Sequence, residues 1–264
     1  MKRAKKIGSV FGIGVYVHWS FLLIPTWVTV SLLTAGAGWS GVFWANLFVI
    51  LVFGCIFLHE LGHSLAARVL GIGTRHITML PIGGVAALER MPRRPAHEAA
   101  VAIAGPAVNF LLAGILMALC MIFSVSPDPR AFLDPGTGML SSLLYANLVI
   151  GMFNLLPIFP MDGGRLLRAA ISTHRGHIRG TLVAARIGQV LAIGLGLLAI
   201  YGNPFLLLLS AFLVVAAEAE RRAVLAEGRM VEMWLRTNGR NPLTWSFGSG
   251  QVKVPVLPPE PASE

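Results

Sequence analysis

Long apolar runs separated by short polar segments dominate this sequence. The runs lie at about 15–34, 42–68, 99–123, 141–160, 184–200 and 205–219. A helix that crosses a bilayer needs about 20 mostly apolar residues, and the first four runs meet that length. The last two are shorter, and Gly202-Asn203-Pro204 between them is typical of a tight helical hairpin. The pattern predicts an all-α, polytopic membrane protein with about six transmembrane helices.

The composition supports a membrane protein and excludes several other classes. Of the 264 residues, 55% are hydrophobic and only 12% are charged, whereas soluble proteins average about 25% charged residues. A disordered chain, a coiled coil and an ordinary soluble enzyme are therefore excluded. The net charge of +9 does not indicate a nucleic-acid partner, because the basic residues lie between apolar runs. The expected surroundings are a lipid bilayer.

The basic residues also predict an orientation. With the N-terminus in the cytoplasm and six spans, all of the 21 Lys and Arg residues except Arg130 fall on the cytoplasmic side, as the positive-inside rule requires. Both termini are then cytoplasmic, in what we expect to be a prokaryotic inner membrane. The first run resembles a signal peptide, but its length and the spans that follow favour a retained anchor.

The sequence divides into a membrane domain and a short tail. Residues 1–222 contain all the apolar runs, with a core expected at about 42–170. Residues 223–264 are expected to be a cytoplasmic tail that begins with a short helix. From Asn241 the tail is rich in Gly, Ser and Pro and is predicted to be largely disordered.

Three acidic residues, Glu60, Asp162 and Glu218, lie in or at the edge of apolar runs. Ionisable groups are costly in a membrane and are candidates for function. Glu218 is followed by further charged residues and is interpreted as interfacial. Glu60 lies in the sequence His59-Glu60-Leu61-Gly62-His63. Residues four apart share one face of a helix, so both imidazoles can bind one metal ion with Glu60 beside them as a general base.

A zinc site of this kind needs a third protein ligand, and Asp162 is the candidate. His59 lies 17 residues after Val42, and Asp162 lies 21 residues after Ser141. If both runs are helices that cross in the same direction, the two residues reach a similar depth near the cytoplasmic side.

The residues around Asp162 also suit a site rather than a simple helix. Pro157 and Pro160 are expected to break the helix and free backbone carbonyl groups. Gly163 and Gly164 permit close backbone approach. Broken backbone at membrane depth is tolerated only where it is buried in protein or lines a wet cavity.

Several further segments between about residues 10 and 170 form a recognisable pattern when they are taken together with the metal motif. The segments are Val17-His18-Trp19-Ser20-Phe21, Pro81-Ile82-Gly83-Gly84-Val85-Ala86, Glu98, Ala104-Gly105-Pro106-Ala107-Val108-Asn109, and Asn154-x-x-Pro157-x-x-Pro160-x-Asp162-Gly163-Gly164-Arg165. With His59-Glu60-x-x-His63, they resemble the site-2 protease family of intramembrane zinc metalloproteases. The resemblance is closest to its compact prokaryotic branch, without a CBS or PDZ domain.

The resemblance implies one Zn²⁺ per chain, held by His59, His63 and Asp162. Glu60 would take a proton from a water molecule and later protonate the leaving amine. Asn109 and Asn154 would bind the substrate backbone or the developing oxyanion. An alternative for both is a structural role, since polar side chains often join helices in membranes.

The resemblance also implies a Gly-rich, membrane-associated hairpin at 79–88. Gly83, Gly84 and Val85 would position the substrate, because an exposed edge can hold an extended peptide by strand addition. The alternative is an ordinary cytoplasmic connector.

The predicted function is hydrolysis of a peptide bond in or near the transmembrane segment of a membrane-anchored protein. The substrates implied by the resemblance are anti-sigma factors, membrane-bound transcription factor precursors and signal peptide remnants. A zinc-binding transporter or sensor, and a non-catalytic membrane scaffold, are the main alternatives. A CAAX-type membrane protease is disfavoured, because it needs a downstream Glu ligand and the apolar runs offer no Glu besides Glu60 and Glu218.

Overall fold

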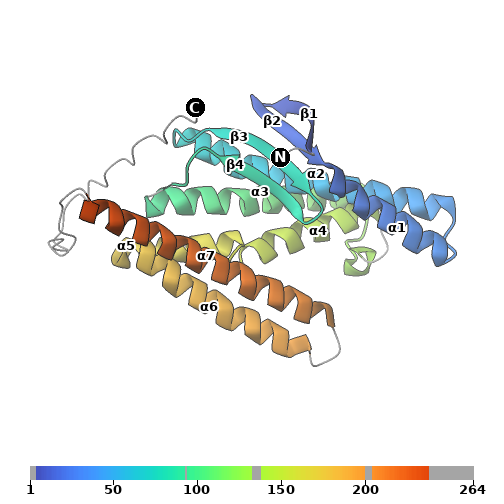
Figure 1. The fold of residues 1–264 in the computed structure, drawn as a ribbon. Helices are drawn as coiled ribbons and strands as arrows, with labels where there is room; N and C mark the ends of the chain where they lie inside the picture. The colour runs from blue at the N-terminus through green and yellow to red at the C-terminus, as the bar shows by residue number, and fades with distance from the viewer. Residues whose placement is uncertain (1–3, 93, 133–137, 200–203, 238–264) are drawn as a thin grey trace. The chain divides into compact units, whose positions relative to one another are not determined.

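Helices make up most of the chain in the computed structural model, which describes residues 4–92, 94–132, 138–199 and 204–237 (Figure 1). They are α1 (Leu23–Thr34), α2 (Trp39–Val69), α3 (Pro95–Ile122), α4 (Met139–Asn154), α5 (Asp162–Arg175), α6 (His177–Leu198) and α7 (Pro204–Thr237). Two short 3-10 turns, η1 (Trp19–Leu22) and η2 (Pro129–Phe132), complete the helical elements. The chain divides into a compact unit up to Val224 and a second unit from Leu225.

Within the described residues, three helices are long and apolar enough to cross a membrane: α2, α3 and α6. They correspond to the second, third and fifth predicted runs, although α6 begins seven residues earlier than expected. The helices in the first and fourth runs are shorter, at 16 residues for η1 with α1 and 16 for α4. The total of six spans therefore stays a prediction.

The predicted helix break in the fourth run is confirmed. Helix α4 ends at Asn154, and the next helix begins only at Asp162. Pro157 and Pro160 lie in the non-helical stretch between them, as expected for residues that cannot continue a helix.

The C-terminal helix differs from the predicted pattern. Helix α7 begins at Pro204, close to the expected start, but continues to Thr237 instead of ending near 219. The turn at Gly202-Asn203 and the predicted disordered tail from Asn241 lie outside the described residues.

The all-α prediction holds only in part, because the mostly helical chain also forms a four-stranded sheet. Its strands are β1 (Ala4–Val10), β2 (Ile13–His18), β3 (Thr74–Leu80) and β4 (Gly83–Leu88), in that spatial order. The outer pairs are antiparallel hairpins, and β2 and β3 pair in parallel. The predicted first span thus loses residues 15–18 to β2. A short apolar run can suit a strand as well as a helix, and hydrophobicity alone does not separate the two.

The sheet packs against α2. Ile13, Ile77 and Met79 of the sheet form a buried cluster with Phe53 and Leu61 of α2. This packing fixes the β3–β4 hairpin beside the His-Glu-His segment, with β4 at the edge of the sheet. The predicted hairpin at 79–88 therefore exists as the end of β3, a turn and the whole of β4.

Helices α2, α3 and α4 pack side by side and hold the site (Figure 1). The contact between α2 and α3 is close at Gly62, where a Cβ atom would lie 2.8 Å from Val108 Cγ2 and 2.9 Å from the Ala104 carbonyl oxygen. A glycine at this position therefore allows the two helices to approach closely.

A buried arginine ties α5 to α3. Arg168 Nε and Nη2 each lie 2.7 Å from Glu98 Oε1, and Arg168 Nη1 also contacts Glu220 of α7. The guanidinium lies over the Phe159 ring, 5.1 Å from its centroid. Because Asp162 is the first residue of α5, this ion pair helps to fix its distance from α3.

Replacing Arg168 by Met should destabilise the protein strongly. The substitution leaves the buried Glu98 carboxylate without its cation, and breaking a buried pair costs about 3–5 kcal/mol. Glu98→Gln should cost less, because Arg168 keeps Glu220 as a partner. Thermal unfolding in detergent measures both variants; equal shifts in Tm would contradict this account.

Candidate metal centre and catalytic site

The two histidines of the motif lie on one face of α2, one helical turn apart. Asp162 reaches them because the chain breaks after α4 and starts again as α5 with Asp162 as its first residue. Gly163 allows this path, since a Cβ atom there would lie only 2.2 Å from the Leu155 carbonyl oxygen. All three ligand candidates are buried.

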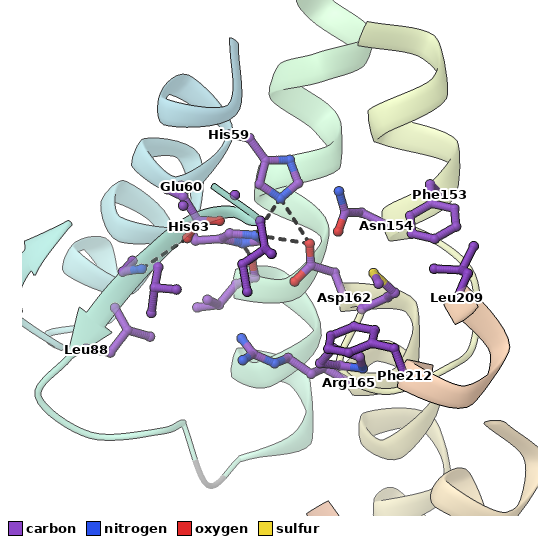
Figure 2. A pocket seen from close by; sticks show the side chains of 18 residues that line it. His59, Glu60, His63, Leu88, Phe153, Asn154, Asp162, Arg165, Leu209 and Phe212 are labelled. Atoms are coloured by element: carbon purple, nitrogen blue, oxygen red, sulfur yellow. Dashed lines mark hydrogen bonds and ion pairs between the residues drawn. The ribbon is translucent and has the colours of Figure 1, made fainter. Parts of the chain in front are cut away.

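The three side chains converge on one point. His59 Nε2 and His63 Nε2 each lie 3.1 Å from Asp162 Oδ2, and the two nitrogens lie 3.1 Å from each other (Figure 2). Ligands held at about 2.0–2.1 Å around a tetrahedral zinc ion would lie about 3.3–3.4 Å apart. The observed triangle is close to that size.

The other ring nitrogens explain why the triangle needs a cation. His63 Nδ1 lies 2.6 Å from the Val101 carbonyl oxygen, and His59 Nδ1 lies 2.5 Å from Asn109 Oδ1. Both partners are acceptors, so each Nδ1 carries the ring proton and each Nε2 presents a lone pair. Two lone pairs and a carboxylate oxygen then face one another without a proton between them. Two imidazoles and one carboxylate are a zinc donor set, and the residues fit the metal.

Gly105 of α3 leaves space for the two imidazole rings. A Cβ atom at this position would lie 2.3 Å from His63 Nε2 and 2.6 Å from His59 Nε2. Any side chain here would therefore collide with the two nitrogen donors.

Glu60 lies beside the donors and is held by the sheet. The Ala86 N–H of β4 donates to Glu60 Oε2 over 3.2 Å. Gly84 of the same strand lets the side chain approach, since a Cβ atom there would lie 2.5 Å from Glu60 Cγ. The carboxylate can thus accept a proton from a molecule in the cavity without losing its position.

A cavity of about 600 Å³ contains these groups. Its walls come from five parts of the chain: the turn of α2 from His59 to His63, the β3–β4 turn with β4, Val101 of α3, the segment from Phe153 to Arg165, and Leu209 with Phe212 of α7 (Figure 2). Gly83, Gly84 and Val85, the residues expected to position a substrate, all line it.

The structure places Asn109 and Asn154 differently, although the sequence analysis gave both the same candidate roles. Asn154 lines the cavity and donates one amide hydrogen to the Ile150 carbonyl oxygen. Asn109 is fully buried behind His59, and it is not among the residues that line the cavity. Its hydrogen-bond partners are His59 and Asn147, so it faces the candidate metal ligands and not the cavity.

Several residues near the site were given no role in the sequence analysis. Arg165, Leu209 and Phe212 line the cavity, and Asn147 binds Asn109. Asn147 offered a signal, because an amide in the middle of an apolar run needs a partner. Cys55 does not approach the donors; its Sγ lies 3.3 Å from Asn147 Nδ2.

Comparison with known proteins agrees with this geometry. The model of peptidase family M50 matches residues 47–134 and 130–195, and the chain belongs to this family, that of the site-2 proteases. The resemblance seen in the sequence is thereby confirmed.

Individual relatives show the extent of the similarity. A zinc metalloprotease of Methanocaldococcus jannaschii is 36% identical over 231 residues, which cover 86% of this chain and 63% of that protein. The solved structure of a site-2 protease from Methanocaldococcus jannaschii is 32% identical, with a TM-score of 0.59, over 83% of this chain and 95% of that one. Stage IV sporulation protein FB of Bacillus subtilis is 35% identical over 113 residues, 42% of this chain and 36% of that protein. This chain therefore spans less than two thirds of the length of the two full-length relatives.

Gly105→Ala should weaken zinc binding, because its methyl group would displace both histidine nitrogens. Disturbing the orientation of metal ligands typically lowers affinity about 10–100-fold. Gly114→Ala is the matched control, since it lies on the same helix with no atom within 4 Å of the added Cβ. Zinc dissociation constants, measured with a competing chelator, should change for the first variant and not for the second. Equal dissociation constants would contradict the account that Gly105 leaves the space in which the two histidine rings are held.

Proposed function

We propose that this protein is an intramembrane zinc metalloprotease that hydrolyses a peptide bond in or near the transmembrane segment of a membrane-anchored substrate. One observation carries the proposal: His59, His63 and Asp162 form a zinc donor set in the same cavity as Glu60. Membership of peptidase family M50 supports the same activity.

The residues of the cavity divide the chemistry among them. His59, His63 and Asp162 would hold the metal, and zinc in such a site would polarise a carbonyl group and lower the pKa of water to about 7. Glu60 takes the proton from the attacking water molecule and passes it to the leaving amine. Asn154 lines the cavity and has an amide hydrogen that is not used by the bond to Ile150, with which it would stabilise the developing oxyanion.

Strand β4 is the proposed docking site for the substrate backbone. Hydrolysis needs an extended substrate, and an edge strand offers free N–H and C=O groups to such a peptide. Gly83, Gly84 and Val85 are at the edge of the sheet and line the cavity, which supports this role.

The charge distribution supports a cytoplasmic location for both termini and for the active-site end of α2. The protease domain would then be residues 1–222 in a prokaryotic cell membrane. The proposed substrates are membrane-anchored regulators, such as anti-sigma factors or transcription factor precursors, and remnant signal peptides. Release of a cytoplasmic fragment would be the outcome of cleavage.

Glu60→Gln separates a protease from a zinc transporter, sensor or scaffold. A general base contributes about 10²–10⁴-fold to the rate, so cleavage of model transmembrane peptides should fall by that factor. Zinc content should stay at one ion per chain, because Glu60 is not one of the three donors. Absence of cleavage by both proteins at equal zinc content would favour the non-catalytic functions.

The uncleaving Glu60→Gln variant also tests the docking strand. A spin label at Val85 should lose mobility when the model peptide is added, because a docked peptide would cover this strand. A label that stays equally mobile would contradict strand addition.

Gly84→Ala should slow cleavage without removing zinc. The added methyl group would push Glu60 Cγ away from β4, and a displacement of about 1 Å in a catalytic group can cost 10²-fold in rate. Gly54→Ala is a suitable control, because this α2 glycine has open space around the added atom. The measurements are kcat and zinc content for both variants. An unchanged kcat for Gly84→Ala would show that catalysis does not depend on the close contact between Glu60 and β4.

A further inference from the structure

A chain of hydrogen bonds runs from the backbone of α4 through two buried amides to the metal ligand His59. Asn147 Nδ2 donates to the Leu143 carbonyl oxygen over 2.9 Å. Asn109 Nδ2 donates to Asn147 Oδ1 over 3.0 Å, and Asn109 Oδ1 lies 2.5 Å from His59 Nδ1. Both asparagines are fully buried and neither lines the cavity, so neither contacts the substrate space.

The direction of every hydrogen bond in this series follows from its first acceptor, the Leu143 carbonyl oxygen. A backbone carbonyl can only accept, so the Asn147 NH₂ group faces Leu143 and its oxygen faces Asn109. An amide oxygen can only accept, so Asn109 directs its NH₂ group to Asn147 and its oxygen to His59. The His59 Nδ1 atom must then be the donor, which leaves a lone pair on Nε2.

The second histidine is fixed in a different way. His63 Nδ1 donates directly to the Val101 carbonyl oxygen, which no side-chain substitution removes. His59 depends on a side chain that would present a donor instead of an acceptor if its amide turned over. A donor at that place would favour the tautomer with the proton on Nε2, directed at the metal.

We infer that Asn147 is a positioning residue for the metal centre, because it acts through Asn109 to keep the Nε2 lone pair of His59 available. The inference rests on the proposed zinc site and adds a residue of α4 to those that determine its affinity. The only other contact of the Asn147 amide in the described part of the chain is Cys55 Sγ, a weak acceptor one turn before His59.

The test measures how Asn147→Leu changes zinc binding in the wild-type protein and in the Asn109→Asp variant. Asn147→Leu removes the hydrogen bonds to the Leu143 carbonyl oxygen and from Asn109 while keeping a side chain that branches at Cγ. Asn109→Asp replaces the amide by a carboxylate, which accepts through either oxygen and cannot present a donor while ionised. The third variant is the double substitution Asn109→Asp/Asn147→Leu. All three are prepared as the full chain in detergent.

A matched control removes an equivalent pair of bonds elsewhere. Asn46 of α2 donates to Thr29 Oγ1 over 3.0 Å and to the Val42 carbonyl oxygen over 2.9 Å. Asn46→Leu therefore loses two acceptors of its amide NH₂ group, one from a side chain and one from the backbone, far along α2 from His59. Asn147→Leu loses two such acceptors and, in addition, the Asn109 donor, which is the bond under test.

Asn147→Leu should bind zinc about 10–100-fold more weakly than the wild type, the usual effect of losing a partner that orients a metal-bound histidine. Asn46→Leu should bind as the wild type does. In the Asn109→Asp background the further change Asn147→Leu should alter affinity less than twofold. The visible absorption of the Co²⁺-loaded proteins should follow the same order, since it reports on the ligand geometry.

Two results would overturn the inference. One is wild-type zinc affinity in Asn147→Leu; the other is an equal loss in both backgrounds, which is what a packing role for Asn147 predicts. A wild-type protein that binds no zinc would instead overturn the proposed function itself. Circular dichroism and thermal unfolding confirm that the compared variants are folded.

Discussion

Mutual repulsion among three electron-rich atoms is the constraint on which the rest of this site depends. Two imidazole lone pairs and a carboxylate oxygen, each 3.1 Å from the others, are stable together only with a cation between them. The protein therefore has to hold the donors in place. Helix α3 does this for both histidines, because it supplies the acceptors at Val101 and Asn109 and the space at Gly105.

The same constraint explains the irregular backbone at the site. Asp162 reaches the two histidines as the first residue of a new helix, α5, and not from within α4. The chain between Asn154 and Asp162 is therefore non-helical, and its polar groups lie next to a cavity, where such backbone is tolerated in a membrane. On the opposite wall, the edge strand β4 provides the N–H group that fixes Glu60.

The sequence predicted the parts of the site that depend on local spacing. The positions of His59 and His63 follow from helical periodicity, and the break before Asp162 follows from two prolines. The sheet was missed, because β2 and β3 pair across about sixty residues and each strand is too short for its pattern to exclude a helix. The role of Asn109 was open for a related reason. An amide can bind a substrate, join helices or orient a ligand, and only the tertiary contacts with His59 and Asn147 distinguish these roles.

Helix α4 is connected to the metal site at two points, which gives it more influence than its lack of metal ligands suggests. Asn147, in its middle, determines how the Asn109 amide faces His59. Its end at Asn154 determines where the chain turns toward Asp162 and places an amide in the cavity. A shift of α4 relative to α3 would therefore change the orientation of one ligand and the position of another at the same time. His63, which is held by the backbone of α3, would be the ligand least affected.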